Sequence, residues 1–369
     1  MIQKLYVHNY RCLENFELKL KDMPSALLIG KNGTGKSTVA AALEIFQSIG
    51  RGVNRVGELV RPFDSARSRA DVPIRFEIEI LLAGQLYEYQ LALELPERFR
   101  ELRVLEETLI VSGKPVYSRQ EAQVTLHISE QNRDAQFSVD WHLVALPVIQ
   151  VQSENDPLHV FRTWLARMII ISPIPTQMTG DSQGETLELL RDVSNFGEWF
   201  TGVLSRYPAA YAHVDQYLRA VMPDIQDVLN EPVGKDARSM VVRFAANQAN
   251  LRVEFGHLSD GEKCFFICAT VLAANKSYGP LFCFWDEPDS YLSLSEVGHF
   301  IVSLRRSFAS QGQFLATSHN GEAIRRFGHE NTFVLDRKSH LEPTLIRRLS
   351  ELSLEGDLIE TLIRGDLEL

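Results

Sequence analysis

The stretch "SALLIGKNGTGKST", residues 25–38, decides the fold. Its apolar run SALLI is followed by a glycine-rich segment that matches G-x-x-x-x-G-K-[ST], the phosphate-binding pattern. Residues 36–49 then have the apolar spacing of a helix, with Val39, Leu43 and Phe46 on one side. Strand, glycine-rich loop and helix form the context that this pattern requires. The sequence therefore predicts a site for the phosphates of ATP or GTP.

Composition is typical of a globular protein with room for about two domains. The 369 residues are 45% hydrophobic and 23% charged, with a formal net charge of −10. This charge argues against a broadly basic nucleic-acid-binding surface. Residues 51–69 hold five arginines and two acids. We favour a solvated loop there over a DNA- or partner-binding patch.

The sequence predicts a cytoplasmic protein without a membrane segment. No apolar stretch approaches the roughly 20 residues of a membrane helix, and residues 1–16 alternate like a strand rather than a leader peptide. Its four cysteines lie mostly in apolar surroundings, which favours buried thiols over a disulfide or a metal site. These are Cys12, Cys264, Cys268 and Cys283.

The predicted elements indicate an α/β protein with an antiparallel part. Residues 1–20 and 74–112 contain alternating strands, whereas 97–165 has no clear pattern. Residues 191–230 have helical spacing, and 240–255 read as a hairpin that turns at "NQAN". From residue 256 the pattern is helix, strand, helix, strand. We therefore expect a mostly parallel core sheet, an antiparallel N-terminal lobe and a helical lobe.

The phosphate loop has the chemistry that a triphosphate needs. Its glycines let backbone N–H groups turn toward phosphate oxygens, and the following helix points its positive end at the same charge. Lys36 is expected to neutralise the β- and γ-phosphates, and the Ser37 hydroxyl to bind Mg²⁺.

Two adjacent acids end the apolar strand of "LFCFWDEPDS", residues 281–290. Asp286 is placed to hold Mg²⁺ through water, and Glu287 to orient and polarise an attacking water. Pro288 cannot continue a strand ladder, so the chain is expected to leave the sheet there. The plain alternative is a strand end with solvated acids.

Two further motifs are weak in isolation. In "HLSDGEK", residues 257–263, Ser259 and Gly261 start a helix and offer a hydroxyl and N–H groups to an anion, although a simple N-cap explains the pattern equally well. In "ATSHN", residues 316–320, His319 follows a strand 32 residues after Glu287. That position suits a sensor of the γ-phosphate, and an ordinary histidine is the alternative.

Taken in order, these motifs resemble those of the ABC-type ATPases, in which the phosphate loop and the signature motif act on one nucleotide from different subunits. "IQKLYVHNYRCLENFELKL" and "LLIGKNGTGKSTVAAALEIF" resemble the N-terminal lobe of the RecF-like, SMC-like and overcoming-lysogenisation-defect (OLD) ATPases. "ISPIPTQM", "FGEWFTGVLSRYP" and "LSDGEKCFFICATVLA" resemble the short RecF/OLD-like ATPases of bacteria. The resemblance covers most of residues 1–336 and is loose over 97–165.

The resemblance implies a role for each motif residue. Glu287 would be the catalytic base and His319 the switch histidine. The metal shell would use Ser37, Asp286 and a glutamine, for which Gln177 is the candidate and Gln183 the nearby alternative. The nucleotide-binding residues would be Gly30, Asn32, Gly33, Gly35, Lys36, Ser37 and Thr38 in the phosphate loop, and Ser259, Gly261 and Glu262 in the signature that closes on the partner subunit's nucleotide.

The sequence departs from the family pattern in three ways. Ser293 stands where family members often carry Asp or His. No long coiled coil is inserted, which argues against an SMC-style tether. No second acidic constellation follows "TSHN", so the OLD-type nuclease domain is missing.

The resemblance implies an ATP- and Mg²⁺-dependent ATPase that dimerises and acts as a switch for a separate effector, a nuclease or toxin, in bacterial anti-phage defence. We expect three segments: an N-terminal ATPase lobe (1–96), an inserted helical lobe (97–238) and a C-terminal ATPase lobe (239–369). The alternative is a RecF-like repair ATPase that clamps DNA when ATP joins two subunits. A scaffold that binds nucleotide without hydrolysis is disfavoured by Glu287 and His319, and a transporter subunit by the N-terminal lobe. Larger assemblies of dimers are also compatible with the resemblance.

Overall fold

The computed structural model describes residues 1–128, 133–246 and 249–352. Its contacts group the chain into two compact units, and each is considered by itself. The first holds residues 1–23, 28–168 and those from 330 on, and the second holds 24–27 and 169–329. The three predicted segments, with boundaries at residues 96 and 238, are functional lobes of an ATPase, whereas these two units are defined by contacts alone. The three segments therefore stay a prediction.

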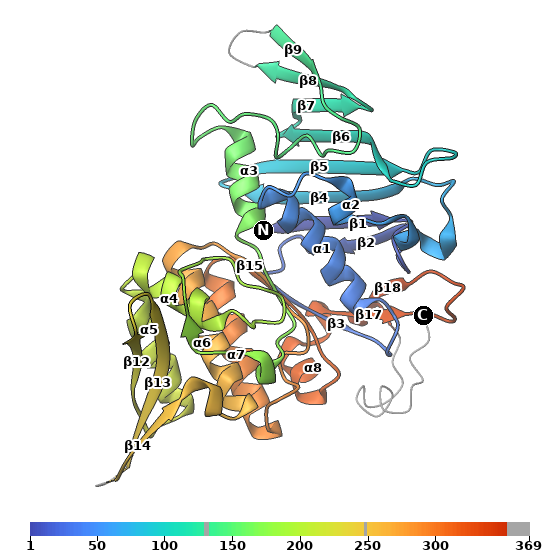
Figure 1. The fold of residues 1–369 in the computed structure, drawn as a ribbon. Helices are drawn as coiled ribbons and strands as arrows, with labels where there is room; N and C mark the ends of the chain where they lie inside the picture. Colours follow the sequence, from blue (N-terminus) through green and yellow to red (C-terminus); the bar gives the residue numbers. More distant parts are fainter. Residues whose placement is uncertain (129–132, 247–248, 353–369) are drawn as a thin grey trace. The chain divides into compact units, whose positions relative to one another are not determined.

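An eight-stranded antiparallel sheet forms most of the first unit (Figure 1). In strand β4 (Ile74–Leu82), Ile74, Phe76 and Ile78 are buried while the residues between them are partly exposed, because successive side chains point to opposite faces. The order is β2-β1-β4-β5-β6-β7-β8-β9, with β1 (Ile2–His8), β2 (Phe16–Lys19), β5 (Gln85–Glu94), β6 (Arg103–Val111), β7 (Lys114–Gln120), β8 (Gln123–Ile128) and β9 (Arg133–Ser138). The predicted antiparallel lobe is confirmed, and the unpatterned region after residue 97 extends it.

Two helices bury the apolar face of this sheet, α1 (Lys36–Gly50) and α3 (Pro157–Ala166). Phe46 of α1 lies edge-on to Phe76, with ring centroids 6.3 Å apart, and Phe161 of α3 lies 5.6 Å from Tyr89. The Gln47 side chain donates a hydrogen bond to the carbonyl of Met168, which ties α1 to the residues that follow α3. The core of the first unit therefore also holds the helix that follows the phosphate loop. A short helix, α2 (Val56–Leu59), precedes the arginines at 61–69.

A buried carboxylate, Glu107 on β6, connects this sheet to residues 140–146. It is fully buried and accepts hydrogen bonds from the hydroxyls of Tyr89 (3.0 Å) and Tyr117 (2.7 Å). It also accepts from the backbone N–H groups of Ala145 (2.7 Å) and Leu146 (2.9 Å). The buried guanidinium of Arg119 lies 3.5 Å away and donates to the carbonyls of Glu121, Leu143 and Asp140. We call these residues the Glu107 cluster; its polar groups are paired, as burial requires.

Parallel strands form the core of the second unit. Strands β10 (Ile169–Ile171), β15 (Phe282–Trp285) and β16 (Gln313–Thr317) pair in parallel, and residues 25–27 of β3 (Ser25–Ile29) follow β16 in the strand order. In the first unit, β17 (Thr332–Asp336) and β18 (Leu345–Arg348) pair antiparallel. The helices of the second unit's core are α6 (Asp260–Tyr278), α7 (Leu294–Ser310) and α8 (Gly321–Phe327). The mostly parallel core sheet is thus confirmed.

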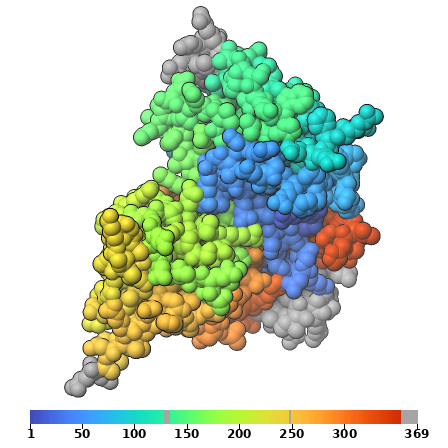
Figure 2. Space-filling view, viewed as in Figure 1, coloured from blue at the N-terminus to red at the C-terminus, as the bar shows by residue number. Residues whose placement is uncertain are grey.

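The predicted helical lobe contains both helices and strands. Helices α4 (Phe196–Arg206) and α5 (Ala210–Val221) lie in the expected range, but β12 (Ile225–Val233) begins where the helical prediction still ran, so that part was wrong. The hairpin predicted over 240–255 is present, and its turn at 247–248 lies outside the described residues. It pairs β13 (Ala237–Ala246) with β14 (Ala249–Glu254), and β13 also pairs with β12 and with β11 (Asp181–Ser182). Figure 2 shows these strands in yellow, projecting from their unit. Among the described residues, no helix is long and apolar enough to cross a membrane.

Candidate functional site

The phosphate loop joins β3 to α1 and depends on two glycines. Gly35 is the N-cap of α1 with a φ of 101°, and a Cβ there would lie 2.9 Å from the Cys12 sulfur. At Gly30 a Cβ would lie 2.2 Å from the Leu335 carbonyl oxygen. Larger residues are therefore excluded by close contact at both positions, and at Gly35 by the left-handed backbone as well. The Thr344 hydroxyl also donates to the carbonyl of Thr34 at 2.8 Å and fixes the loop from a distant part of the chain.

Lys36 lies within the loop that it was predicted to serve. Its side chain is buried, and its ammonium donates to the carbonyls of Gly30 (2.7 Å) and Lys31 (3.2 Å). The next residue, Ser37, is exposed at the first turn of α1, as is Asn32 in the loop. A buried ammonium at the start of a helix is suited to an anion of high charge.

A second group of predicted residues meets at the carboxyl ends of β15 and β16. Asp286 follows β15, and its backbone N–H donates to the carbonyl of Ile171 on β10 at 2.8 Å. The Thr317 hydroxyl donates to Asp286 Oδ1 at 2.5 Å and accepts from the Glu287 N–H at 2.9 Å. His319 Nε2 lies 3.5 Å from Glu287 Oε1. The structure thus brings Asp286, Glu287 and His319 together, as adjacent parallel strands predict.

Glu287 has an unusual backbone and an accessible side chain. Its φ of 50° lies in the left-handed region, which costs a non-glycine residue on the order of 1 kcal/mol and persists only where the surroundings enforce it. The side chain is 46% exposed and accepts a hydrogen bond from Ser290 at 3.0 Å. A strained, solvent-accessible carboxylate next to an imidazole is able to hold and deprotonate a water molecule.

The signature segment starts α6 with a capping box. The Ser259 hydroxyl accepts from the Glu262 N–H and donates to Glu262 Oε2 at 2.7 Å, while the Ser259 N–H donates to the same oxygen at 2.7 Å. Ser259 is exposed, and a Cβ on Gly261 would lie 3.1 Å from the Tyr291 carbonyl. The N-cap interpretation is correct locally, and it leaves the anion-binding interpretation open because the exposed helix start is the same surface.

The glutamine candidates lie on either side of a short strand. Gln177 ends a 3₁₀ turn (Pro175–Gln177), Gln183 follows β11, and both are exposed. The buried ammonium of Lys263, one residue after the signature, donates to the carbonyl of Pro175 at 3.0 Å. The signature helix is therefore tied to the turn that carries Gln177.

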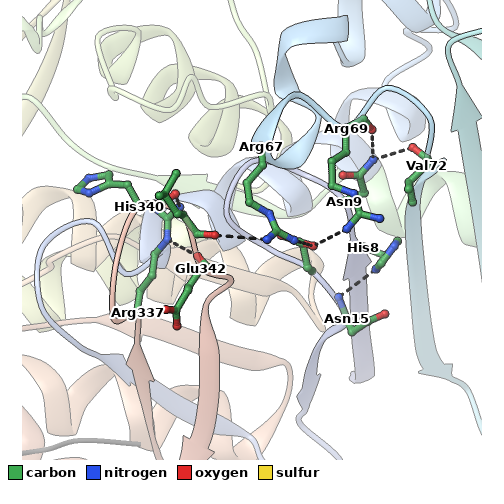
Figure 3. A network of polar contacts seen from close by, with 11 residues as sticks. His8, Asn9, Asn15, Arg67, Arg69, Val72, Arg337, His340 and Glu342 are labelled. Atoms are coloured by element: carbon green, nitrogen blue, oxygen red, sulfur yellow. Dashed lines mark hydrogen bonds and ion pairs between the residues drawn. The ribbon is translucent and has the colours of Figure 1, made fainter.

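Several arginines of residues 51–69 contact groups of their own unit, and Figure 3 shows Arg67 and Arg69 among them. Arg67 lies 2.5 Å and Arg69 3.4 Å from the carboxylate of Glu14, and Arg67 also donates to the Leu341 carbonyl. Arg51 donates to the carbonyl of Ala166. These contacts support the solvated-loop interpretation over a DNA-binding patch.

The four cysteines are buried free thiols, as predicted. Burial raises the pKa of the Cys264 thiol to about 12 and that of Cys268 further, so neither is a reactive thiolate.

The donor set fits Mg²⁺ rather than a cage-bound metal. Among described residues no group of three His, Cys, Asp or Glu side chains could hold an ion. Mg²⁺ characteristically uses one or two protein oxygens together with phosphates and water. Asp286 offers a carboxylate and Ser37 a hydroxyl of the kinds that Mg²⁺ uses.

Thr317, Ser318 and Asp289 lie within the predicted motifs, but their roles were not predicted from the sequence. All three are buried, and they fix the loops that carry Glu287 and His319. Two sequence features could have indicated these roles: the "TS" at the end of a strand and the second acid of DEPD, which are both unusual for loops that face solvent.

Comparison with known proteins identifies the family. Residues 25–325 match the family described as "AAA domain, putative AbiEii toxin, Type IV TA system", and because this covers more than half of the chain, the chain belongs to that family. No curated protein matches it. Among solved structures it resembles an SMC head bound to the C-terminal winged-helix domain of ScpA (TM-score 0.53, 11% identity, covering 95% of this chain and 99% of that one). An SMC head domain from Thermotoga maritima has a TM-score of 0.48 at 14% identity, covering 94% and 98%. The likeness to the SMC head with a TM-score of 0.53 shows that the fold is that of an SMC head ATPase domain.

Proposed function

We propose that this chain binds and hydrolyses ATP, that ATP joins two copies, and that this cycle controls a separate effector protein. The observation that carries the proposal is the arrangement of Asp286, Thr317, Glu287 and His319 at the ends of β15 and β16. A plain strand end with solvated acids needs neither the strained Glu287 nor the buried Thr317.

In the proposed mechanism the Lys36 ammonium leaves the carbonyls of Gly30 and Lys31 and binds the β- and γ-phosphates. Ser37 and Asp286 are the residues proposed to hold Mg²⁺, which would offset the charge of the phosphates when bound. Glu287 then accepts a proton from a water that attacks the γ-phosphorus, while the bond to the β–γ bridging oxygen breaks. The products are ADP, phosphate and a proton.

His319 is proposed to donate a hydrogen bond to the γ-phosphate. It lies within reach of Glu287, so its position responds to whether the phosphate is present. Ser259 and Gly261 of a second copy are proposed to face the same phosphate, because they lie at the exposed N-terminus of a 19-residue helix. The exposed side chains of Tyr291 and Leu294 lie in the segment after Glu287 and suit an interface between copies.

An effector surface is proposed on the open face of the eight-stranded sheet. A hollow of about 360 Å³ lies over β4 to β8 and is lined partly by residues of the region 97–165, which the ATPase core is not expected to need. Hydroxyl and amide side chains such as Gln90, Thr108 and Ser118 line it together with Glu77, whose pKa is raised by burial. Their mixture suits a polar protein segment with a basic group. The effector is proposed to be a nuclease or toxin in bacterial anti-phage defence.

The test uses two variants with opposite defects. Lys36→Ala should lose at least about 3 kcal/mol of binding, roughly a hundredfold in Kd, because charge-assisted hydrogen bonds to phosphate disappear. Glu287→Gln should bind ATP normally and accumulate a dimer detectable by light scattering. Wild-type binding by the first variant, or full turnover by the second, would contradict the proposal.

The same proteins separate a switch from a DNA clamp. A clamp predicts ATP-dependent DNA binding that weakens with salt and is lost when Arg51, Arg55, Arg61, Arg67 and Arg69 are neutralised. The switch predicts instead that the activity of the product of a neighbouring gene, expressed together with this chain, changes in both variants. An unchanged effector activity would refute the effector part alone.

A further inference from the structure

Two consecutive hydroxyls at the end of β16 hold the loop that follows β15. Thr317 binds the near side of this loop, at Asp286 and the N–H of Glu287. Ser318, which is fully buried, donates its hydroxyl proton to Asp289 Oδ2 at 2.9 Å on the far side. The Ser318 oxygen in turn accepts from the N–H of Asn320 at 2.9 Å. Glu287 lies between the two attachment points, and His319 follows directly after Ser318.

Asp289 is a residue whose burial lowers the stability of the fold. It is only 8% exposed, and its Oδ1 has no hydrogen-bond partner among the described residues. Burying a carboxyl group without a cation destabilises the fold, and burial together with nearby Glu287 raises its pKa. A serine or threonine could fill such a site at lower free-energy cost. Stability therefore does not account for an acid here, whereas a long, rigid acceptor that reaches Ser318 does.

The strained backbone of Glu287 explains what this contact restrains. A residue with a φ of 50° relaxes toward ordinary conformations unless both flanks are fixed. Thr317 fixes one flank, and the hydrogen bond from Ser318 to Asp289 fixes the other. Relaxation would move the Glu287 carboxylate away from His319, now 3.5 Å distant.

We propose that Asp289 is a positioning residue that acts through Ser318 to hold Glu287 facing His319. The proposal rests on the proposed ATPase function, in which Glu287 handles the attacking water. Asp289 itself touches neither nucleotide nor water.

Turnover kinetics test the role directly. Asp289→Ala and Ser318→Ala should lower kcat about tenfold to a hundredfold, since a shift on the order of 1 Å at a catalytic group has that effect. KM for ATP should change less than about threefold, because the phosphate loop is untouched. Asp289→Asn keeps an oxygen that accepts from Ser318 and should recover most of kcat. Ser310→Ala, an exposed serine at the end of α7, is the matched control.

Hydrogen exchange measured without nucleotide provides a readout independent of activity. The amides of Ser290 and Leu292 donate to carbonyls within the loop, and the amide of Glu287 donates to the Thr317 hydroxyl. They should exchange faster in Asp289→Ala and Ser318→Ala than in Asp289→Asn or the control. If wild-type protein does not hydrolyse ATP, the proposed function fails while exchange still decides the positioning role. Unchanged exchange, or an Asp289→Asn variant as slow in turnover as Asp289→Ala, would overturn the proposal.

Discussion

Two carboxylates of this chain, those of Glu107 and Glu287, accept hydrogen bonds from hydroxyl groups, but they differ in burial, in backbone conformation and in the number of their partners. Glu107 is fully buried and accepts four hydrogen bonds. Glu287 is 46% exposed, has a strained backbone and lies 3.5 Å from a partly exposed histidine. The hydrogen bonds to Glu107 compensate its buried charge and hold β6 against residues 145–146. The arrangement at Glu287 leaves capacity for a further partner, which is what a catalytic base needs.

Removing the Glu107 carboxylate should have the largest effect on stability. Glu107→Ala leaves two tyrosine hydroxyls and two N–H groups buried without their acceptor and the Arg119 charge without its carboxylate. It should cost about 3–5 kcal/mol of unfolding free energy. Urea denaturation followed by circular dichroism measures this loss. Glu107→Gln keeps the oxygen and should lose less. A loss below about 1 kcal/mol in the alanine variant would mean that the cluster is not the anchor described.

Glu287→Gln should show the reverse pattern. Hydrolysis should fall about 10²- to 10³-fold through loss of the general base, while the unfolding free energy stays within about 0.5 kcal/mol, as for other exposed sites. Phosphate release and thermal melting measure the two quantities on one sample. A large stability change would show that the two carboxylates are more alike than the structure indicates.

Deleting one donor from each carboxylate makes a matched pair. Tyr117→Phe removes a buried 2.7 Å hydrogen bond to Glu107 and should cost about 1–2 kcal/mol. Ser290→Ala removes an exposed 3.0 Å bond to Glu287 and should cost less than about 0.5 kcal/mol. Equal costs, by chemical denaturation, would contradict the contrast between the two sites.

The smallest predicted effect concerns pH. Burial raises the pKa of Asp289 above that of an unfolded aspartate, near 4. The folded chain then holds a proton that the unfolded chain releases. The stabilising contribution is present below the ordinary pKa and is lost as pH rises through the raised one. Relative to Asp289→Asn, wild type should therefore lose about 1 kcal/mol or less above pH 4, visible in paired melting curves. A difference that is independent of pH would refute this.

Local signals explain which parts of the molecule the sequence predicted well. The strand before residue 30 and the helix after it follow from adjacent residues, and the meeting of DEPD with "TSH" follows from parallel strand ends. The fold class was therefore predictable. Strands β7 to β9 were not, because charged Arg119 occupies a buried position in the alternation of β7. In β12 the spacing of Ile225, Val228 and Leu229 resembles that of a helix, and pairing with β13 overrides it.

The motif residues of the candidate site were predictable from the sequence, but the residues that hold them in place were not. Asp289 and Ser318 meet only because β15 and β16 pair with Trp285 opposite Ala316, a register that no local pattern reports. The roles of the motif residues stay predictions until the variants above are measured.

The capping box at Ser259 has a consequence for how tightly a second copy can hold ATP. The Glu262 carboxylate already takes both the hydroxyl and the N–H of Ser259. It is an internal competitor, tethered one helical turn away, and any phosphate that binds there has to displace it. Tethering gives such a competitor a high effective concentration. We therefore expect the helix start to reject weakly charged or poorly placed anions and to yield only to one that brings more negative charge, so that a third phosphate is distinguished from two by competition rather than by shape.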